Sequence, residues 1–315
     1  MYTFLKFPHK KECHMNGLTD YITKARWVDI FTIWYVLIDD AYQHLIRSHG
    51  RRLRRRGPEP TFGDSEVITV ALVIETFFHG HEALGLAFVD QYHRDLFPCL
   101  LDKSQYNRRR RALTGVMELL RRQLTHVLLD PQDRTRLIDS APVPACTYTR
   151  QNECETAVGM EYRGVVVSKR AKLYGHRFYA TVTTSQVVDS WMVAPASYKE
   201  GKLMPEFFAH QANLFVLADY GFHSPLEMQW LADQRDITLV TAKRKDARQP
   251  HPAWFRRLHR RMRRLIETAF SVMTVVFNLE TPGSRSLSGL LSRLTTTVLA
   301  YNLSFLTNVE LLALE

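Results

Sequence analysis

The chain has 315 residues, enough for one large domain or two ordinary ones, and its 45% hydrophobic and 23% charged residues are typical of a globular protein with a sizeable core. Its 42 lysines and arginines outnumber its 32 aspartates and glutamates, and the net charge of +10, gathered in arginine runs, favours a nucleic-acid partner. Four cysteines without a CxxC pair argue against a zinc ribbon and are typical of free thiols in a reducing cytosol.

Residues 1–130 are predicted to form an all-helical domain, because their apolar residues recur at helical spacing. Helices are expected over 21–46, over 64–78 with Asp64 as N-cap, over 81–93 and over 104–129. The apolar run at 30–38 is too short to span a bilayer, and the N-terminal stretch lacks the apolar core of a signal peptide. We therefore expect a cytoplasmic protein with no membrane partner.

Two arginine clusters lie in this part of the chain. The run RRLRRRG at 51–57 is either a DNA-contacting arm or a solvated basic loop, and the sequence favours neither. Arg108, Arg109 and Arg110 are expected in the first turns of the helix that opens at Ser104, where backbone amides add donors for phosphate. These arginines predict that the domain 1–130 binds DNA.

After Asp130 the pattern changes to short runs rich in Val, Thr, Tyr and Phe. Strands are expected at 134–142, 172–185, 186–197, 213–219 and 237–243, the second and third of these forming a hairpin. Helices are expected at 224–234, 254–279 and 286–313; Ser224 with Glu227 is predicted to form a capping box at the start of the first. This order predicts an α/β domain over 131–315, a mixed sheet with helices on its faces.

Three acids follow or adjoin these elements. Asp139 ends the apolar run LID, and Asp219 ends the run NLFVLAD. Functional groups gather at the carboxyl ends of strands in open α/β sheets, so the two carboxylates are expected side by side if their strands are parallel neighbours. Glu267 falls at the rim of an apolar stripe on the helix 254–279, and Arg256, Arg260 and Arg263 precede it on nearly the same line.

Phosphodiester cleavage or transfer needs such an arrangement. Three carboxylates hold two Mg²⁺ ions about 3.5–4 Å apart, and these ions clamp the attacking and leaving oxygens of an in-line displacement. Alternatives without function exist for each acid: an aspartate after a strand is often a turn former, and Glu267 can pair with Arg263 on its own helix.

The segments LIDSAPVPAC, SKRAKLYGHRFYATVT, VLADYGFHS and RRLIETAFS resemble the catalytic domain of bacterial insertion-sequence transposases of the DDE type, which have a ribonuclease H-like fold. FGDSEVITVAL and FPCLLDKSQYNRRRRAL are similar to the N-terminal half of one such family, the insertion sequence 982 family. The resemblance covers nearly the whole chain. It implies that Asp139, Asp219 and Glu267 are the catalytic and metal-binding acids, with Arg263 as the family's arginine.

The resemblance implies Mg²⁺, or Mn²⁺ in its place, as cofactor, with no small-molecule cofactor. It further implies terminal inverted repeats and target DNA as partners, a homodimer on DNA, and association with the nucleoid. Such enzymes nick element ends and transfer the freed 3′-OH strand to target DNA. Two positions depart from related enzymes: Lys199-Glu200 replaces a His-Asp pair after the hairpin, and Thr274 replaces a basic residue.

Further candidates for DNA contacts flank the predicted strands: Lys169, Arg170, Lys243 and Lys245. Asp189 and Asp233 are rival acids, but neither ends a central strand. His79 and His81 are expected in a turn, since no third ligand accompanies them. Two alternatives to a transposase stay open: another ribonuclease H-like nuclease, and a catalytically inactive DNA-binding remnant.

Overall fold

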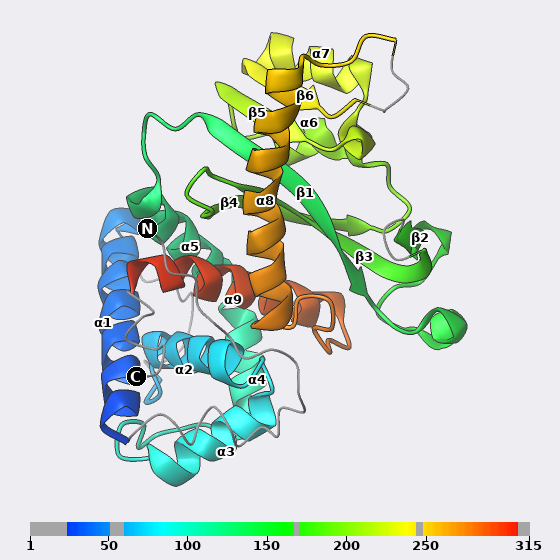
Figure 1. Ribbon diagram of the computed structural model, residues 1–315. Coiled ribbons are helices and arrows are strands. Elements are labelled where there is room, and N and C mark those ends of the chain that lie inside the picture. Colours follow the sequence, from blue (N-terminus) through cyan, green and yellow to red (C-terminus); the bar gives the residue numbers. More distant parts are fainter. Residues whose placement is uncertain (1–23, 51–59, 167–169, 244–247, 308–315) are drawn as a thin grey trace. The chain divides into compact units, whose positions relative to one another are not determined.

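The computed structural model describes residues 24–50, 60–166, 170–243 and 248–307 (Figure 1). The chain divides into two compact units, which we describe separately. Unit 1 comprises residues 1–128, 276–278 and 288–315, and unit 2 comprises residues 129–275 and 279–287. The run RRLRRRG at 51–57 lies outside the described residues.

Unit 1 is helical wherever the structure describes it. Its helices are α1 (Lys24–His49), α2 (Asp64–Phe77), α3 (Glu82–Tyr92), α4 (Lys103–Ala112), α5 (Thr114–Leu128) and α9 (Leu287–Leu306). Most residues of helices α2 and α9 are buried, 10 of 14 and 13 of 20, which suits helices at the centre of a bundle. Aromatic residues of α1 and α2 pack at its side, where Trp27 lies 4.8 Å from Phe77 between ring centroids.

The last helix belongs to unit 1, although the sequence predicts it as part of the domain 131–315. The Arg293 Nε atom of α9 lies 2.9 Å from the buried carboxylate of Glu75 in α2, and the Thr297 hydroxyl donates to the same carboxylate at 2.5 Å. Arg293 also donates to the carbonyl of His79 at 2.5 Å. This polar contact fixes α9 against the N-terminal helices.

The observed helix ends differ from three sequence predictions. Gly63 rather than Asp64 is the N-cap of α2; the Asp64 carboxylate instead accepts from Tyr42 and pairs with Arg109 at 2.5 Å. The helix expected over 104–129 breaks at Leu113 into α4 and α5. Ser224 does precede α7 (Pro225–Arg235), but its hydroxyl donates to the Glu227 side chain, so the capping box is not formed.

Unit 2 contains a mixed open sheet with helices beside it. Its described strands are β1 (Thr135–Pro144), β2 (Arg163–Val166), β3 (Ala171–Val182), β4 (Val188–Pro195), β5 (Leu214–Ala218) and β6 (Ile237–Thr241). Strands β3 and β4 form the predicted hairpin, and β3 pairs antiparallel with β1. Strand β1 then pairs parallel with β5, and β5 with β6. The short strand β2, which pairs with the start of β3, was not predicted.

The two faces of this sheet carry different partners. Phe178 of β3 packs on Phe270 of α8 (Ala253–Val275), with ring centroids 6.0 Å apart. The next residue, Tyr179, points to the opposite face because successive residues of a strand alternate. There it joins an apolar cluster with Phe208, which follows α6 (Met204–Phe207), and Phe222. The sheet of unit 2 therefore has helices on both faces, as an α/β protein requires.

No single helix among the described residues is long and apolar enough to cross a bilayer. Helices α2 and α3 reach that length and composition only as a pair, which is bent by 113° at its break.

Candidate active site

The sheet topology brings Asp139 and Asp219 together. Ile138 and Ala218 form the last parallel pair between β1 and β5, so the two aspartates follow at adjacent positions. Asp219 ends its strand as predicted. Asp139 does not: β1 continues to Pro144, paired only with β3. Beyond this point β1 stays paired with β3, while the chain after β5 leaves the sheet. An open α/β sheet has its crevice where two neighbouring strands part in this way.

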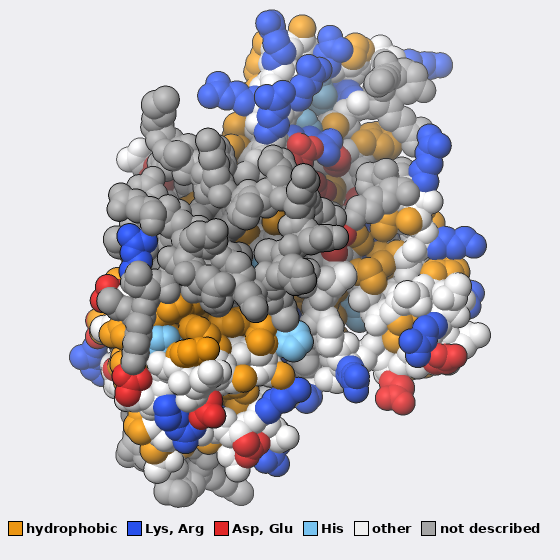
Figure 2. All heavy atoms as spheres, turned by 60° about the horizontal axis from the view of Figure 1, so that its bottom comes forward, with side chains coloured by type: hydrophobic (Ala, Val, Ile, Leu, Met, Phe, Trp, Pro, Cys, Tyr) orange, Lys and Arg blue, Asp and Glu red, His pale blue; other side chains and the backbone are white. Residues whose placement is uncertain are grey.

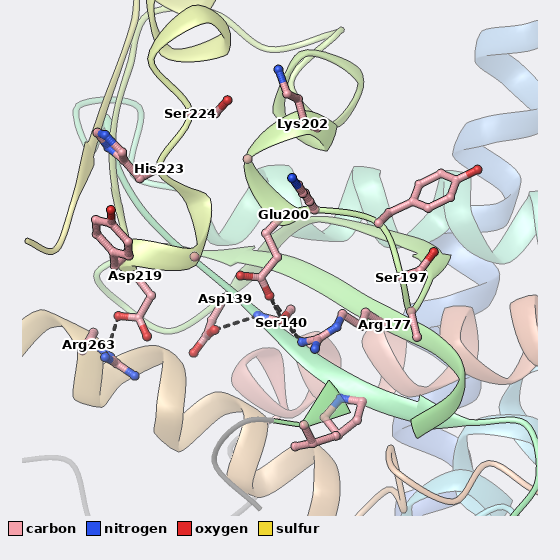
Figure 3. Close-up of a pocket in the computed structure, with 18 residues that line it drawn as sticks. Asp139, Ser140, Arg177, Ser197, Glu200, Lys202, Asp219, His223, Ser224 and Arg263 are labelled. Carbon is pink, nitrogen blue, oxygen red and sulfur yellow. Dashed lines mark hydrogen bonds and ion pairs between the residues drawn. The ribbon is translucent and has the colours of Figure 1, made fainter. Parts of the chain in front are cut away.

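A cavity of about 830 Å³ lies at this point of unit 2 (Figure 3). Its walls come from β1, β3, the segment after β4, the turn after β5, and α8. Carboxylates, cations and hydroxyls from these elements line it, among them Asp139, Asp219, Glu200, Arg177, Lys202, Arg263, Ser140 and Ser224.

Asp139 and Ser140 point to different faces of the sheet. Asp139 pairs with Ala180 and therefore shares the face of Phe178, where α8 lies, whereas Ser140 pairs with Tyr179 on the other face. Because both residues line the cavity, the cavity reaches both faces of the sheet at β1.

The environment of Asp139 disfavours its charged form. Burial raises the pKa of Asp139 to about 6, even though the backbone N–H of Ser140 donates to its Oδ1 at 2.8 Å. The neighbouring Asp219 carboxylate raises the pKa further, Arg263 lowers it, and Glu200 raises it. Burial and like charge at a cavity are typical of functional acids.

Asp219 is held by one cation. Its Oδ1 lies 2.5 Å from Nη1 of Arg263, an ion pair on a cavity wall. Because the Asp219 side chain is 30% exposed and lines the cavity, its carboxylate is accessible to a ligand from there.

Glu267 lies at the edge of this site and not inside it. Its side chain is 54% exposed, and its Oε1 is 3.2 Å from Nη2 of Arg263. It does not line the cavity, although its helix partner Arg263 does. Arg263 therefore lies between Asp219 and Glu267 as a shared cation. The rim position that helical spacing indicates for Glu267 agrees with this exposure.

The apolar stripe predicted on α8 is wrong at its N-terminal end. Helical spacing from Ile266 and Phe270 places Leu258 on this stripe, yet it is 43% exposed. The adjacent His259 is buried instead, and its Nε2 lies 3.1 Å from the carbonyl oxygen of Ala218 at the end of β5. A histidine in place of an apolar residue fits here because the last residue of β5 offers an acceptor.

Sequence reasoning missed Glu200 as a residue of the cavity and noted it only as a departure from the family. Its Oε1 accepts from the Ser140 hydroxyl at 2.6 Å and lies 3.4 Å from Nη1 of Arg177. A Cβ at Gly221 would lie 2.2 Å from its Oε2, so the glycine after Asp219 and Tyr220 leaves room for this carboxylate. The pair Glu200-Gly201, in a turn before a helix, was the available signal.

The donor set of the cavity suits a hard divalent cation. Asp139 and Asp219 supply carboxylate oxygens, the ligands that Mg²⁺ prefers, and both line the cavity. Within the described ranges, no three His, Cys, Asp or Glu side chains are grouped closely enough to bind one ion as they stand. Glu267 would therefore have to turn inward, past Arg263, to join the two aspartates.

Exposed arginines extend from the site along α8. Between Ala253 and Arg264 the helix carries no acid, and its exposed arginines include Arg256 and Arg260 from the predicted set. Figure 2 shows Lys and Arg side chains gathered where the N-terminal half of α8 lies. These side chains are available to a polyanion, because most of them point into solvent.

The arginines of α4 are placed differently from the prediction. Helix α4 begins at Lys103, so Arg108 and the arginines after it occupy its last turns and lack the amide donors of a helix N-terminus. Arg110 is buried and lies 2.9 Å from Glu82, and Arg109 pairs with Asp64. Only Arg108 of the predicted three is exposed. Helix pairing thus engages two of these guanidinium groups within unit 1.

Two of the four remaining residues that were predicted to contact DNA are among the described residues. Lys243 is exposed, and its Nζ donates to the carbonyl of Gln249 at 2.7 Å. Arg170 is exposed in a turn with φ 47°. Lys169 and Lys245 lie outside the described residues. Neither Lys243 nor Arg170 lines the cavity.

The rival acids lie away from the cavity. Asp189 is bound to Arg136 at 2.6 Å, and exposed Asp233 accepts from Gln229 on α7. His79 and His81 flank the turn between α2 and α3; His79 contacts the Val276 carbonyl at 2.7 Å and His81 is the N-cap of α3. Cys99, Cys146 and Cys154 are free cysteines, as expected.

The structure thus defines an α/β protein whose mixed open sheet carries an acid-lined cavity where its strands divide. Comparisons of the chain with protein-family models, with curated proteins and with solved structures give no match. The geometry of the site is therefore the basis on which a function can be proposed.

Proposed function

We propose that this chain is a DNA transposase of the DDE type, which nicks element ends and transfers the 3′-OH strand to target DNA. The observation that carries the proposal is the pair Asp139 and Asp219, juxtaposed where parallel strands β1 and β5 part and lining one cavity. An acid pair at such a crevice, beside an arginine-covered helix, is what metal-dependent chemistry on a phosphodiester requires.

The proposal assigns a distinct task to each acidic group. Asp139 and Asp219 would hold Mg²⁺ or Mn²⁺, and Glu267 would complete the set from α8. The bound ions would supply activation of the attacking oxygen and charge neutralisation at the phosphate. Arg263 now compensates Asp219 and Glu267, at 2.5 and 3.2 Å, and would turn to the substrate phosphate when a cation takes over that task.

The finer fold assignment, ribonuclease H-like, belongs to the same proposal. It is supported by the position of β1, which pairs antiparallel with a hairpin strand on one side and parallel with β5 on the other. The helix that carries Glu267 packs on the Asp139 face of this sheet, where Phe270 meets Phe178. The family resemblance of the sequence agrees with this arrangement.

DNA is the proposed partner, both as element end and as target. The acid-free, arginine-covered half of α8 lies next to the acids, so a backbone bound there would lead into the cavity. Joining two element ends needs two copies of the site, and we propose a homodimer on DNA. Association with the nucleoid would follow from DNA binding.

The test is cleavage of a labelled duplex that carries the end of the element encoding this chain, with and without Mg²⁺. Asp139→Asn and Glu267→Gln are each expected to slow nicking at least a hundredfold while DNA binding persists, since a lost metal ligand removes several kcal/mol of stabilisation. Asp233→Asn removes an exposed acid outside the cavity and serves as the matched control.

The outcomes separate three functions. Metal-dependent nicking followed by strand transfer supports the transposase, and nicking without any joining indicates another ribonuclease H-like nuclease. The exposure of Glu267 and its pairing with Arg263 favour a third candidate, a DNA-binding remnant. Binding with no metal-dependent cut, unchanged in Glu267→Gln, would establish that candidate and overturn the enzyme.

A further inference from the structure

The turn after β5 carries an exposed aromatic pair at the mouth of the cavity. The rings of Tyr220 and His223 are stacked, with centroids 5.5 Å apart and planes 14° from parallel. Both residues line the cavity, both are exposed, and Tyr220 retains 39% of its surface. Figure 3 shows His223 on the same side of the cavity as Asp219. The aromatic pair is therefore a neighbour of Asp219 in the wall of the cavity.

The protein holds this pair in a fixed position. Between the two rings in sequence, Phe222 is fully buried and packs on Tyr179, with centroids 6.4 Å apart. The backbone N–H of His223 donates to the Tyr220 carbonyl at 3.0 Å, and His223 Nδ1 lies 3.2 Å from the Thr241 hydroxyl. A stack anchored in this way loses little further entropy when a ligand binds to it.

The aromatic and cationic side chains around the pair indicate which class of ligand it could bind. Exposed Lys199 and Tyr198, which is 48% exposed, line the same cavity, and Arg263 lies at its Asp219 wall. Flat aromatic surfaces beside cations are the two components of single-strand nucleic-acid sites: the rings accept bases, and the cations accept phosphates. Since every base has a π face, such a site tolerates any sequence.

We propose that the Tyr220–His223 stack binds the base of the nucleotide next to the phosphate held at Asp139 and Asp219. The inference rests on the proposed function, since it presumes a DNA substrate. Tyr220 directly follows Asp219, so a base on this ring lies within about one nucleotide of the reacting phosphate. A base stacked on the protein is no longer stacked and paired in its duplex. The site therefore takes DNA that is locally unpaired at the point of reaction.

The experiment compares binding of two labelled DNA probes of equal length and sequence on one strand. One is a fully paired duplex and the other a fork whose last few nucleotides are unpaired. Fluorescence anisotropy of the full chain is measured in EDTA, so that the strands stay intact. The wild type is expected to bind the fork about tenfold more tightly, which is the size of one base–ring stack.

Variants of the ring identify its role. Tyr220→Ala is expected to reduce the preference for the fork to less than about twofold and to leave binding of the paired duplex unchanged, whereas Tyr220→Phe keeps the preference. Trp230→Ala is the matched control, because Trp230 on α7 is also 39% exposed but does not line the cavity. Thermal melting of each variant verifies that the chain is folded.

Failure of this inference is distinct from failure of the proposed function. A wild type that binds both probes equally, or a Tyr220→Ala variant that keeps the full preference, overturns the base-binding stack even if the element end is still cut. A wild type that binds neither probe overturns the stack and the DNA-dependent function together. Loss of the preference in Tyr220→Phe as well would assign the effect to the hydroxyl and also overturn the stack.

Discussion

Each unit contains a carboxylate–arginine contact, and the two contacts differ in their exposure to water. In unit 1, Glu75 is 1% exposed and accepts from Arg293 and Thr297, while Arg293 makes further bonds to backbone carbonyls. In unit 2, Arg263 lies 2.5 Å from Asp219 and 3.2 Å from Glu267, and the three side chains are 39%, 30% and 54% exposed. A buried pair enclosed by hydrogen bonds serves the fold, whereas a partly exposed pair at a cavity can exchange its partner for a ligand.

The largest expected effect concerns the buried pair of unit 1, Glu75 with Arg293. Arg293→Ala leaves Glu75 buried without its cation, and the free energy of unfolding is expected to fall by about 3–5 kcal/mol in a urea titration. Arg94→Ala removes an exposed pair with Asp90 and is expected to change stability by less than about 0.5 kcal/mol. Equal costs for the two variants would contradict the structural role of the buried pair.

A change of opposite sign is expected at the cavity. The pKa of Asp139 is raised from 3.8 to about 6 in the folded chain, so the native state binds its proton more tightly than the unfolded state does. Ionisation of Asp139 then lowers stability as pH rises from about 4 to 6, and the loss persists at neutral pH. Asp139→Asn is expected to stabilise the chain at pH 7 by on the order of 1–3 kcal/mol.

Melting curves between pH 3.5 and pH 8 check this expectation. The gain from Asp139→Asn should vanish at the acid end, where the carboxyl is protonated in both states. Asp233→Asn, which removes an exposed acid of α7 outside the cavity, is the matched control. A gain that is the same at every pH would show that removal of the charge is not its cause.

A smaller effect tests whether Gly221 makes room for Glu200. In Gly221→Ala the new methyl group would displace the Glu200 carboxylate from Ser140, and stability is expected to fall by about 1 kcal/mol, the value of one hydrogen bond. In a Glu200→Ala background the same glycine change should cost close to nothing. Additive losses in the double variant would mean that Gly221 acts through another contact.

The smallest effect concerns one surface arginine. Arg260→Gln is expected to reduce the slope of log binding constant against log salt by about 0.9 in DNA titrations, the contribution of one phosphate contact. Arg150→Gln, an exposed arginine of unit 2 that pairs with Glu153, should leave the slope unchanged. If both variants give the same slope as the wild type, the α8 surface does not carry the DNA backbone.

The sequence was sufficient for the order of the described strands other than β2, and for the neighbourhood of Asp139 and Asp219 once their strands are parallel neighbours. Period-two patterns bounded by turns specify strands locally, whereas the parallel pairing of β1 with β5 had to be assumed. The prediction that Asp139 ends its strand was wrong, because APVP continues in pairing with β3 despite its two prolines. Local patterns do not tell where a partner strand stops.

Features set by tertiary contacts escaped sequence reasoning. Glu200 enters the cavity only because Gly221, from a turn distant in sequence, lets it approach. Arg110 is spaced like a surface arginine and is nevertheless buried against Glu82. Helix α9 looks like a neighbour of α8 in the sequence, yet Glu75, 218 residues earlier than Arg293, decides where it packs.

The place of α9 also has a consequence for how the chain is made. About 160 residues separate Leu128, the last residue of the N-terminal segment of unit 1, from Ser288. At roughly 5–20 residues per second, the ribosome needs on the order of 10–30 s to synthesise them. During that interval Glu75 and the apolar side chains that α9 will cover have no native partner. A nascent chain in this state is expected to be a substrate for chaperones, and a fragment that ends at residue 130 should not fold into a stable bundle.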